Sequence, residues 1–258
     1  MTPSVPTLVP ASDSPRHSDE EAQGSTDLAR LMVRAPLTTD ERLANSHLFV
    51  RRQAFSRMLT LNSLYQQILD VPGCIIQCGV RYGGDLVTLC SLRGIHEPYN
   101  YSRRIIGFDT FTGLAGTSEA DHGSAHVADG QFGVAAGHEE YLAELLHAHA
   151  QNSPLAHVQK QELIKGDATQ TVPRFLEDNP GEQIAMLYLD MDIYAPTKAA
   201  LAASVDRLVP GSIVVFDEFG DSRFPGEARA YREVLKGRRH RLHRAPTSTV
   251  TAYAVIEE

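Results

Sequence analysis

The sequence predicts an α/β fold with a mostly parallel seven-stranded sheet, helices on both faces of the sheet and an antiparallel strand at one edge. Three observations predict it: five short apolar runs, helical patterns between these runs, and two final runs with no helix between them. Strands covered on both faces form continuous apolar runs, and strands that alternate with helices form parallel sheets. The five runs are residues 74–79, 105–108, 162–165, 185–189 and 212–216.

The stretches between these runs have the apolar spacing of amphipathic helices. The last two runs, residues 241–243 and 249–256, follow each other directly, which is typical of an antiparallel pair. The predicted helices are residues 83–92, 138–150, 169–177, 196–208 and 226–237.

The N-terminal part differs from the rest of the 258-residue chain. Residues 1–27 are rich in Pro, Ser, Thr, Asp and Glu, and they contain too few large apolar residues to offset the entropy of ordering, so we expect a disordered tail. Residues 28–258 are long enough for one α/β domain. Within it, residues 28–71 form a helical addition, because apolar residues recur at helical spacing from Thr39 until Pro72-Gly73.

Charge and cysteine content exclude several classes of protein. The net charge of −8 disfavours binding to nucleic acid or to a membrane surface, and no apolar stretch is long enough to span a bilayer. The short basic run at residues 236–244 reads as a solvated helix end and the start of a strand. Three cysteines and no secretory signal indicate a reducing, cytoplasmic location.

Ligands of a parallel sheet bind beyond the carboxyl ends of its strands, so residues there are site candidates. After the first run, Gly79, Gly83 and Gly84 allow a sharp turn and close approach of a ligand. The spacing GxxxGG is not the dinucleotide pattern, and it suits a cofactor with a carboxylate and a ribose but no pyrophosphate. A tight β–α turn without a ligand remains equally possible from this pattern alone.

Acidic residues follow the second and third runs. Asp109 can accept hydrogen bonds from two ribose hydroxyls, or it can cap a turn. Asp167 can accept a hydrogen bond from an adenine amino group, and it can also be the N-cap of the next helix.

Two acidic pairs follow the fourth and fifth runs, namely Asp190 with Asp192 and Asp217 with Glu218. Carboxylates at neighbouring strand ends converge and repel one another, which a divalent cation with oxygen ligands such as Mg²⁺ resolves. The alternative is that these acids cap the following helices or face solvent. Two acidic pairs on neighbouring strands favour the metal site.

Four segments around these residues resemble the macrocin O-methyltransferase (TylF-type) family of sugar O-methyltransferases, from about Arg51 to Glu233. The resemblance implies a Rossmann-like class I methyltransferase fold, and within the family it extends to members of calicheamicin biosynthesis that act on rhamnose. The matching segments are VPGCIIQCGVRYGGD (71–85), GFDTFTGL (107–114), LYLDMDIYAPTKAAL (187–201) and LVPGSIVVFDEFGD (208–221).

The resemblance implies S-adenosyl-L-methionine as cofactor, S-adenosyl-L-homocysteine as product and Mg²⁺ as metal. Asp190, Asp217 and Glu218 match the metal ligands. Asp192 and Asp190 are the candidate catalytic residues, and Asp192 matches the second acid of the family's aspartate pair, a candidate base. Gln77 stands where the family usually has Glu, Glu218 where it has Asp, and Met191 where it has Gly. The implied cofactor-binding residues are Gln77, Cys78, Gly79, Gly83, Gly84, Asp109, Thr110, Gly166, Asp167, Ala168 and Asp190.

The expected reaction is methylation of a sugar hydroxyl on a glycosylated natural product, a small-molecule partner, by a homo-oligomeric enzyme. The polar segment 112–137 reads as a lid over the acceptor, and its His122 and His126 are rival bases. A catechol or phenol O-methyltransferase would share all of these motifs. A nucleotide-binding α/β protein that is not a methyltransferase is the alternative of another class, disfavoured because GxGxxG and GxxxxGK[ST] are both absent.

Overall fold

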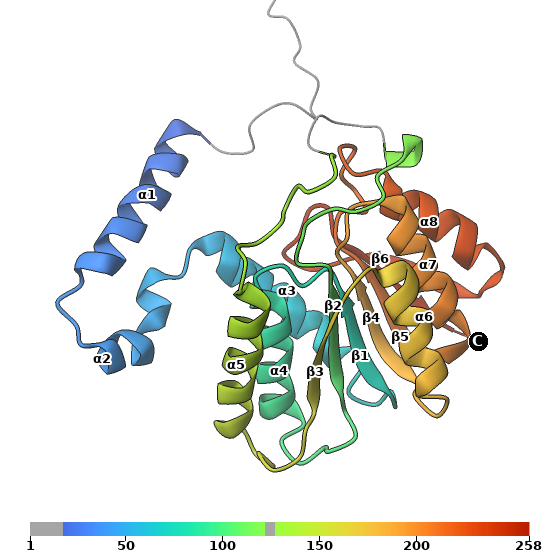
Figure 1. The fold of residues 1–258 in the computed structure, drawn as a ribbon, viewed down its shortest axis with the longest axis horizontal. Helices are drawn as coiled ribbons and strands as arrows, with labels where there is room; N and C mark the ends of the chain where they lie inside the picture. The colour runs from blue at the N-terminus through green and yellow to red at the C-terminus, as the bar shows by residue number, and fades with distance from the viewer. Residues whose placement is uncertain (1–17, 122–126, 258) are drawn as a thin grey trace, which may run out of the picture. The chain divides into compact units, whose positions relative to one another are not determined.

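The computed structural model describes residues 18–121 and 127–257, and its core is a seven-stranded sheet in the order β3-β2-β1-β4-β5-β7-β6 (Figure 1). Strands β1 to β5 pair in parallel, whereas β7 is antiparallel to both β5 and the edge strand β6. The predicted Rossmann-like fold, with an antiparallel pair at one edge, is confirmed. The strands are β1 (Cys74–Cys78), β2 (Ile105–Asp109), β3 (Gln161–Lys165), β4 (Ile184–Leu189), β5 (Leu208–Phe216), β6 (His240–Arg244) and β7 (Ala252–Ile256).

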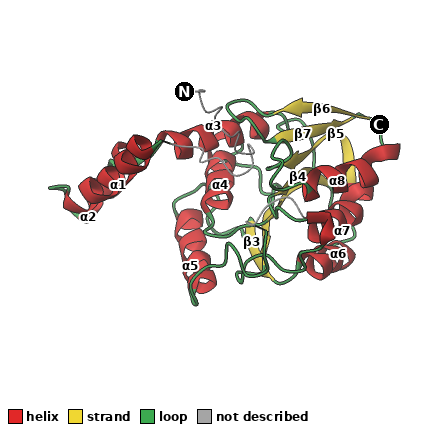
Figure 2. Ribbon diagram, turned by 90° about the horizontal axis from the view of Figure 1, so that it is seen from above, coloured by secondary structure: helices red, strands yellow, loops and turns green. Residues whose placement is uncertain are grey.

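Helices cover both faces of this sheet, and alternate strand residues face the two layers. Figure 2 shows α4 and α5 on one side and α6, α7 and α8 on the other. Because the chain reverses its strand order between β1 and β4, the carboxyl ends of these two strands are the expected ligand site. The helices are α1 (Asp19–Arg34), α2 (Thr39–Ala44), α3 (Arg52–Gln66), α4 (Gly84–His96), α5 (His138–Gln151), α6 (Ala168–Asp178), α7 (Tyr194–Ser204) and α8 (Gly226–Val234).

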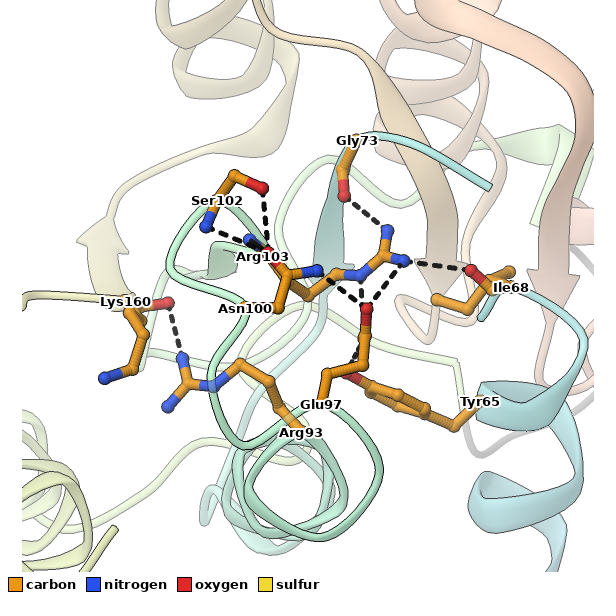
Figure 3. A network of polar contacts seen from close by, with 9 residues as sticks. All are labelled: Tyr65, Ile68, Gly73, Arg93, Glu97, Asn100, Ser102, Arg103 and Lys160. Atoms are coloured by element: carbon orange, nitrogen blue, oxygen red, sulfur yellow. Dashed lines mark hydrogen bonds and ion pairs between the residues drawn. The ribbon is translucent and has the colours of Figure 1, made fainter. Parts of the chain in front are cut away.

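A buried ion pair lies at the amino-terminal ends of β1 and β2, opposite the strand ends that are expected to bind ligands (Figure 3). Arg103 donates to Glu97 at 2.9 Å and to the carbonyl of Ile68 at 2.9 Å, and it also donates to the carbonyl of Gly73. Tyr65 donates its hydroxyl to Glu97 at 2.6 Å. Each member of this cluster has a partner within it, so we assign it the structural role of holding the end of α3 against the start of the sheet.

The N-terminal helix begins earlier than the sequence analysis expected. Helix α1 starts at Asp19, so residues 19–27 of the predicted disordered tail are helical, and residues 1–17 lie outside the described residues. A capping box explains the start, because Ser18 accepts from the N–H of Glu21 and Glu21 accepts from the N–H of Ser18. The chain divides after Arg57 into two compact units, and the sheet belongs to the second.

No helix in the described ranges is both long and apolar enough to cross a membrane.

Candidate active site

The turn after β1 places the predicted glycines against the end of β4. Gly79 has a φ of +90°, and a Cβ atom there would lie 1.8 Å from the backbone oxygen of Asp190. The N–H of Asp190 donates to the carbonyl of Cys78 at 2.8 Å. Gly83 is the left-handed N-cap of α4, and nothing lies within 4 Å of a Cβ atom built at Gly84. The turn therefore requires glycine at residue 79 and leaves the start of α4 open to a cofactor.

Gln77 and Cys78 point to opposite faces of β1. The Nε2 of Gln77 donates to the carbonyl of Gly79 at 3.0 Å, while its Oε1 is buried without a hydrogen-bond partner among the described residues. Cys78 packs into the layer of α6 and α7, where burial raises the pKa of its thiol. Cys78 can therefore offer a cofactor only its backbone, whereas Gln77 keeps a buried acceptor next to the turn.

Asp109 joins the ends of β1 and β2. One carboxylate oxygen accepts from the N–H groups of Val80 at 2.6 Å and Arg81 at 2.7 Å, and the other accepts from the N–H of Phe111 at 2.6 Å. Thr110 donates its hydroxyl to the carbonyl of Gly113 at 2.9 Å. The structure thus shows Asp109 in the turn-capping role that the sequence analysis gave as its alternative. Because a carboxylate offers about four acceptor positions, one remains, and not two, for a ribose hydroxyl.

Asp167 is the N-cap of α6, since its carboxylate accepts from the N–H of Thr169 at 2.8 Å. The N–H of Gly166 donates to the carbonyl of Asp109 at 2.9 Å, which aligns the ends of β2 and β3. Ala168 is the first, buried residue of the helix. The capping role expected for Asp167 is confirmed, and it uses only one of the two carboxylate oxygens.

The two acidic pairs meet at the ends of β4 and β5. Burial, and then the charge of Asp217, raise the pKa of Asp192 to about 6 and that of Glu218 to about 8. Asp192 has a left-handed φ of +65°, a conformation that costs energy and is concentrated at functional sites. Asp217 is 7% exposed, and its Oδ1 accepts from the hydroxyls of Tyr188 at 2.7 Å and Thr251 at 3.2 Å. The structure thus brings Asp192, Asp217 and Glu218 together beside Asp190.

Glu227 is an acidic residue of this cluster that the sequence analysis missed. Its side chain is fully buried, and its Oε2 accepts from the N–H of Glu218 at 2.9 Å, while its Oε1 has no partner among the described residues. Burial, and then the charges of Asp217 and Asp192, raise its pKa well above the ordinary value. On sequence, Glu227 looks like a solvent-facing residue in the first turn of a helix.

The segment 112–137 is only partly as predicted. Asp121, expected among the polar residues facing the acceptor, is 1% exposed and accepts from the N–H of Tyr194 at 2.5 Å and the N–H of Ser118 at 3.0 Å. Asp121 therefore joins this segment to the start of α7. The rival bases His122 and His126 lie outside the described residues.

The acidic cluster has the donor chemistry of a site for a hard divalent cation. Glu218 Oε2 and Glu227 Oε1 are buried carboxylate oxygens without a partner among the described residues, and Mg²⁺ prefers oxygen ligands. However, no three His, Cys, Asp or Glu side chains within residues 18–121 and 127–257 lie in a ligand arrangement around a common point. The predicted ligands Asp190, Asp217 and Glu218 thus share an edge of the sheet without forming a preassembled set, as mutual repulsion of carboxylates favours.

Comparison with known proteins identifies the family. The model of the macrocin-O-methyltransferase (TylF) family matches residues 53–240, while no curated protein sequence is significantly similar. The structure of CalS11, calicheamicin methyltransferase, is 41% identical with a TM-score of 0.88, covering 93% of this chain and 94% of CalS11. The apo structure of CalS11, named a TDP-rhamnose 3'-O-methyltransferase, is 40% identical with a TM-score of 0.82, covering 93% and 96%.

The O-methyltransferase NovP shares the fold at 17% identity, with a TM-score of 0.58 and coverage of 79% of this chain and 80% of NovP. The family match spans the glycine turn after β1 and the acidic ends of β4 and β5. The chain therefore belongs to the macrocin-O-methyltransferase (TylF) family and is an S-adenosylmethionine-dependent O-methyltransferase.

Proposed function

We propose that this enzyme methylates a hydroxyl of a sugar that becomes part of a glycosylated natural product. The observation that carries the proposal is the contact of Gly79 with Asp190, which puts the cofactor turn directly beside the acidic cluster. The similar protein CalS11 is named a TDP-rhamnose 3'-O-methyltransferase, which supports a sugar acceptor. A catechol or phenol acceptor is the second candidate, because it would use the same strand ends.

The reaction needs a base, because a sugar hydroxyl is a poor nucleophile at neutral pH. Asp192 is the candidate: its pKa of about 6 leaves it largely ionised at pH 7, yet makes it more basic than an ordinary aspartate. As Asp192 takes the proton, the hydroxyl oxygen forms a bond to the sulfonium methyl carbon. The carbon–sulfur bond breaks, and its electron pair stays on sulfur, giving S-adenosyl-L-homocysteine.

The remaining residues position the reactants. Gln77, the turn at Gly79, Asp109 and Asp167 bind the cofactor, and a bound Mg²⁺ would lower the pKa of the acceptor hydroxyl. Asp190, Asp217 and Glu218 are the residues that would hold this ion. Holding acceptor and methyl group in line contributes several kcal/mol to catalysis.

The test is a methyl-transfer assay that compares glycosylated metabolites, nucleotide sugars, catechols and simple phenols. We expect transfer to the sugars, and we expect Asp192→Asn to abolish transfer while the variant still binds S-adenosyl-L-homocysteine in calorimetry. Asp206→Asn, an exposed acid after α7, is the matched control and should retain activity. Preferred transfer to phenols would overturn the sugar acceptor and leave the enzyme class standing.

We also propose that the enzyme is a homo-oligomer. The first compact unit carries large apolar side chains that are exposed in the single chain, including Val33 at 73%, Leu43 at 75% and Leu48 at 57%. Exposed apolar residues gathered in one short region are typical of an interaction surface. Light scattering coupled to size-exclusion chromatography tests this, and a mass of one chain, 28.3 kDa, would contradict it.

A further inference from the structure

Arg81 has an unusual environment in the turn after β1. It follows β1 directly, its side chain is exposed, and its guanidinium carbon lies 4.9 Å from the centre of the Tyr82 ring and 5.0 Å from that of Phe132. The guanidinium makes no hydrogen bond or ion pair with any residue that the structure describes. Its five N–H donors are therefore held near two aromatic rings without an acceptor.

The backbone keeps this side chain in place. Arg81 has a φ of +49° and Phe132 a φ of +66°, conformations that cost a non-glycine residue about 1–3 kcal/mol and persist only where the surroundings impose them. The carboxylate of Asp109 imposes the first, because it accepts the N–H of Arg81 at 2.7 Å. The backbone at Arg81 is thus held by the same residue that is expected to bind the cofactor ribose.

A second arginine lies along the same row of rings. The rings of Phe132 and Phe224 are 6.3 Å apart, and the guanidinium carbon of Arg223 lies 5.6 Å from the ring of Phe224. Arg223 follows β5 and forms an ion pair with the buried Asp221 at 2.7 Å. Residues 81, 132, 224 and 223 therefore form a continuous row, the cation–aromatic row, that joins the β1 turn to the loop before α8.

The row borders the acidic cluster, since the charges of both arginines lower the pKa of Asp192. A dianionic acceptor would be repelled by the carboxylates at the ends of β4 and β5 unless cations lie near these carboxylates. Arg223 is largely neutralised by Asp221, so Arg81 supplies the free charge. Guanidinium groups match phosphate oxygens with paired hydrogen bonds.

We propose that the cation–aromatic row binds the diphosphate of a nucleotide sugar, with Arg81 as the main ligand and Arg223 as the second, so that the sugar is methylated before it is transferred to its final scaffold. The inference rests on the proposed function, because it specifies the form in which the sugar acceptor arrives. The methionyl carboxylate of the cofactor is another anion with oxygen pairs. The diphosphate is favoured because the row carries two guanidinium groups, Arg81 at the Phe132 ring and Arg223 at the Phe224 ring, whereas one carboxylate needs only one such group.

The test measures binding by calorimetry of thymidine diphosphate and, separately, of S-adenosyl-L-homocysteine. We expect Arg81→Gln to weaken thymidine diphosphate binding about 10-fold or more and to leave S-adenosyl-L-homocysteine binding unchanged. Arg81→Lys, which keeps the charge but loses the paired geometry, should fall between the two. Arg229→Gln is the matched control, because this exposed arginine also lies over a ring, 5.2 Å from Tyr194, but on the outside of α8.

Two results would overturn the inference: equal binding of thymidine diphosphate by wild type and both Arg81 variants, or a loss in Arg81→Gln that affects only S-adenosyl-L-homocysteine. The thermal midpoint of each variant shows whether it is folded, and the Arg81→Lys variant keeps the test valid if Arg81→Gln is not. A different result would reject the proposed function and leave the inference about the binding site intact. Tight, Arg81-dependent binding of thymidine diphosphate without methylation of any sugar would reject the acceptor reaction and leave this site standing.

Discussion

Replacing Tyr188 with Phe tests whether the acidic cluster is held by its buried hydrogen bonds. The substitution removes only the hydroxyl that donates to Asp217 Oδ1 at 2.7 Å, and the ring remains in a fully buried position. A hydrogen bond to a charged group contributes about 1.5–3 kcal/mol to stability. Because the Thr251 hydroxyl still reaches the same oxygen at 3.2 Å, we expect the lower end, a loss of about 1.5 kcal/mol in the free energy of unfolding.

Urea unfolding of Tyr188→Phe and Tyr253→Phe measures this loss against a matched control. Tyr253 lies in the same core layer, 9% exposed, and its hydroxyl makes no hydrogen bond within the described part of the chain, so its variant should lose less than about 0.5 kcal/mol. Tyr188→Phe should also weaken Mg²⁺ binding in calorimetry about 10-fold, as expected when a residue that orients a ligand is removed. Equal stability of the two variants together with unchanged Mg²⁺ affinity would refute the reasoning.

Three further predictions concern the same strand ends. Asp109→Asn removes one acceptor from a group that already receives three N–H donors, so it should weaken S-adenosyl-L-homocysteine binding markedly; unchanged affinity in calorimetry would exclude Asp109 from the cofactor site. Exhaustive chelation should abolish methyl transfer and added Mg²⁺ should restore it, with Glu218→Gln needing more Mg²⁺; full activity after chelation would reject the metal. Without a divalent cation, the raised pKa values of Asp192, about 6, and Glu218, about 8, mean that the folded state binds protons more tightly than the unfolded state. Their contribution to stability should therefore be largest below about pH 4 and should decline as the pH rises to about 8, which melting temperatures across this range will show or contradict.

The parts of the fold that sequence analysis predicted are those with a strong local pattern. The apolar runs of β1, β4 and β5 were identified because each strand is buried on both faces, and the acids at 190, 217 and 218 could be grouped because parallel strands share a carboxyl edge. The N-cap role of Asp167 could also be predicted from the sequence, because a cap depends on residues one to three positions away.

The parts that it missed depend on contacts between distant segments. Glu227 lies in the site because the start of α8 packs closely against the start of α7. A Cβ atom at Gly226 would lie 2.4 Å from the backbone nitrogen of Tyr194. Asp121 is buried by the same junction, and no local pattern marks either residue. The start of α1 is a different case, because the Ser18–Glu21 capping box was present in the sequence and the acidic, serine-rich composition around it favoured a disordered tail.

The contact between Gly79 and Asp190 has a thermodynamic consequence. A backbone that leaves no room for a methyl group between these residues cannot shift at the β1 turn without also shifting the end of β4. Any ligand that adjusts one loop must then change the affinity of the other loop for its own ligand, and by reciprocity the two effects are equal in size. Methyl donor and cation should therefore change each other's affinity by the same factor, which calorimetry of each ligand with and without the other measures.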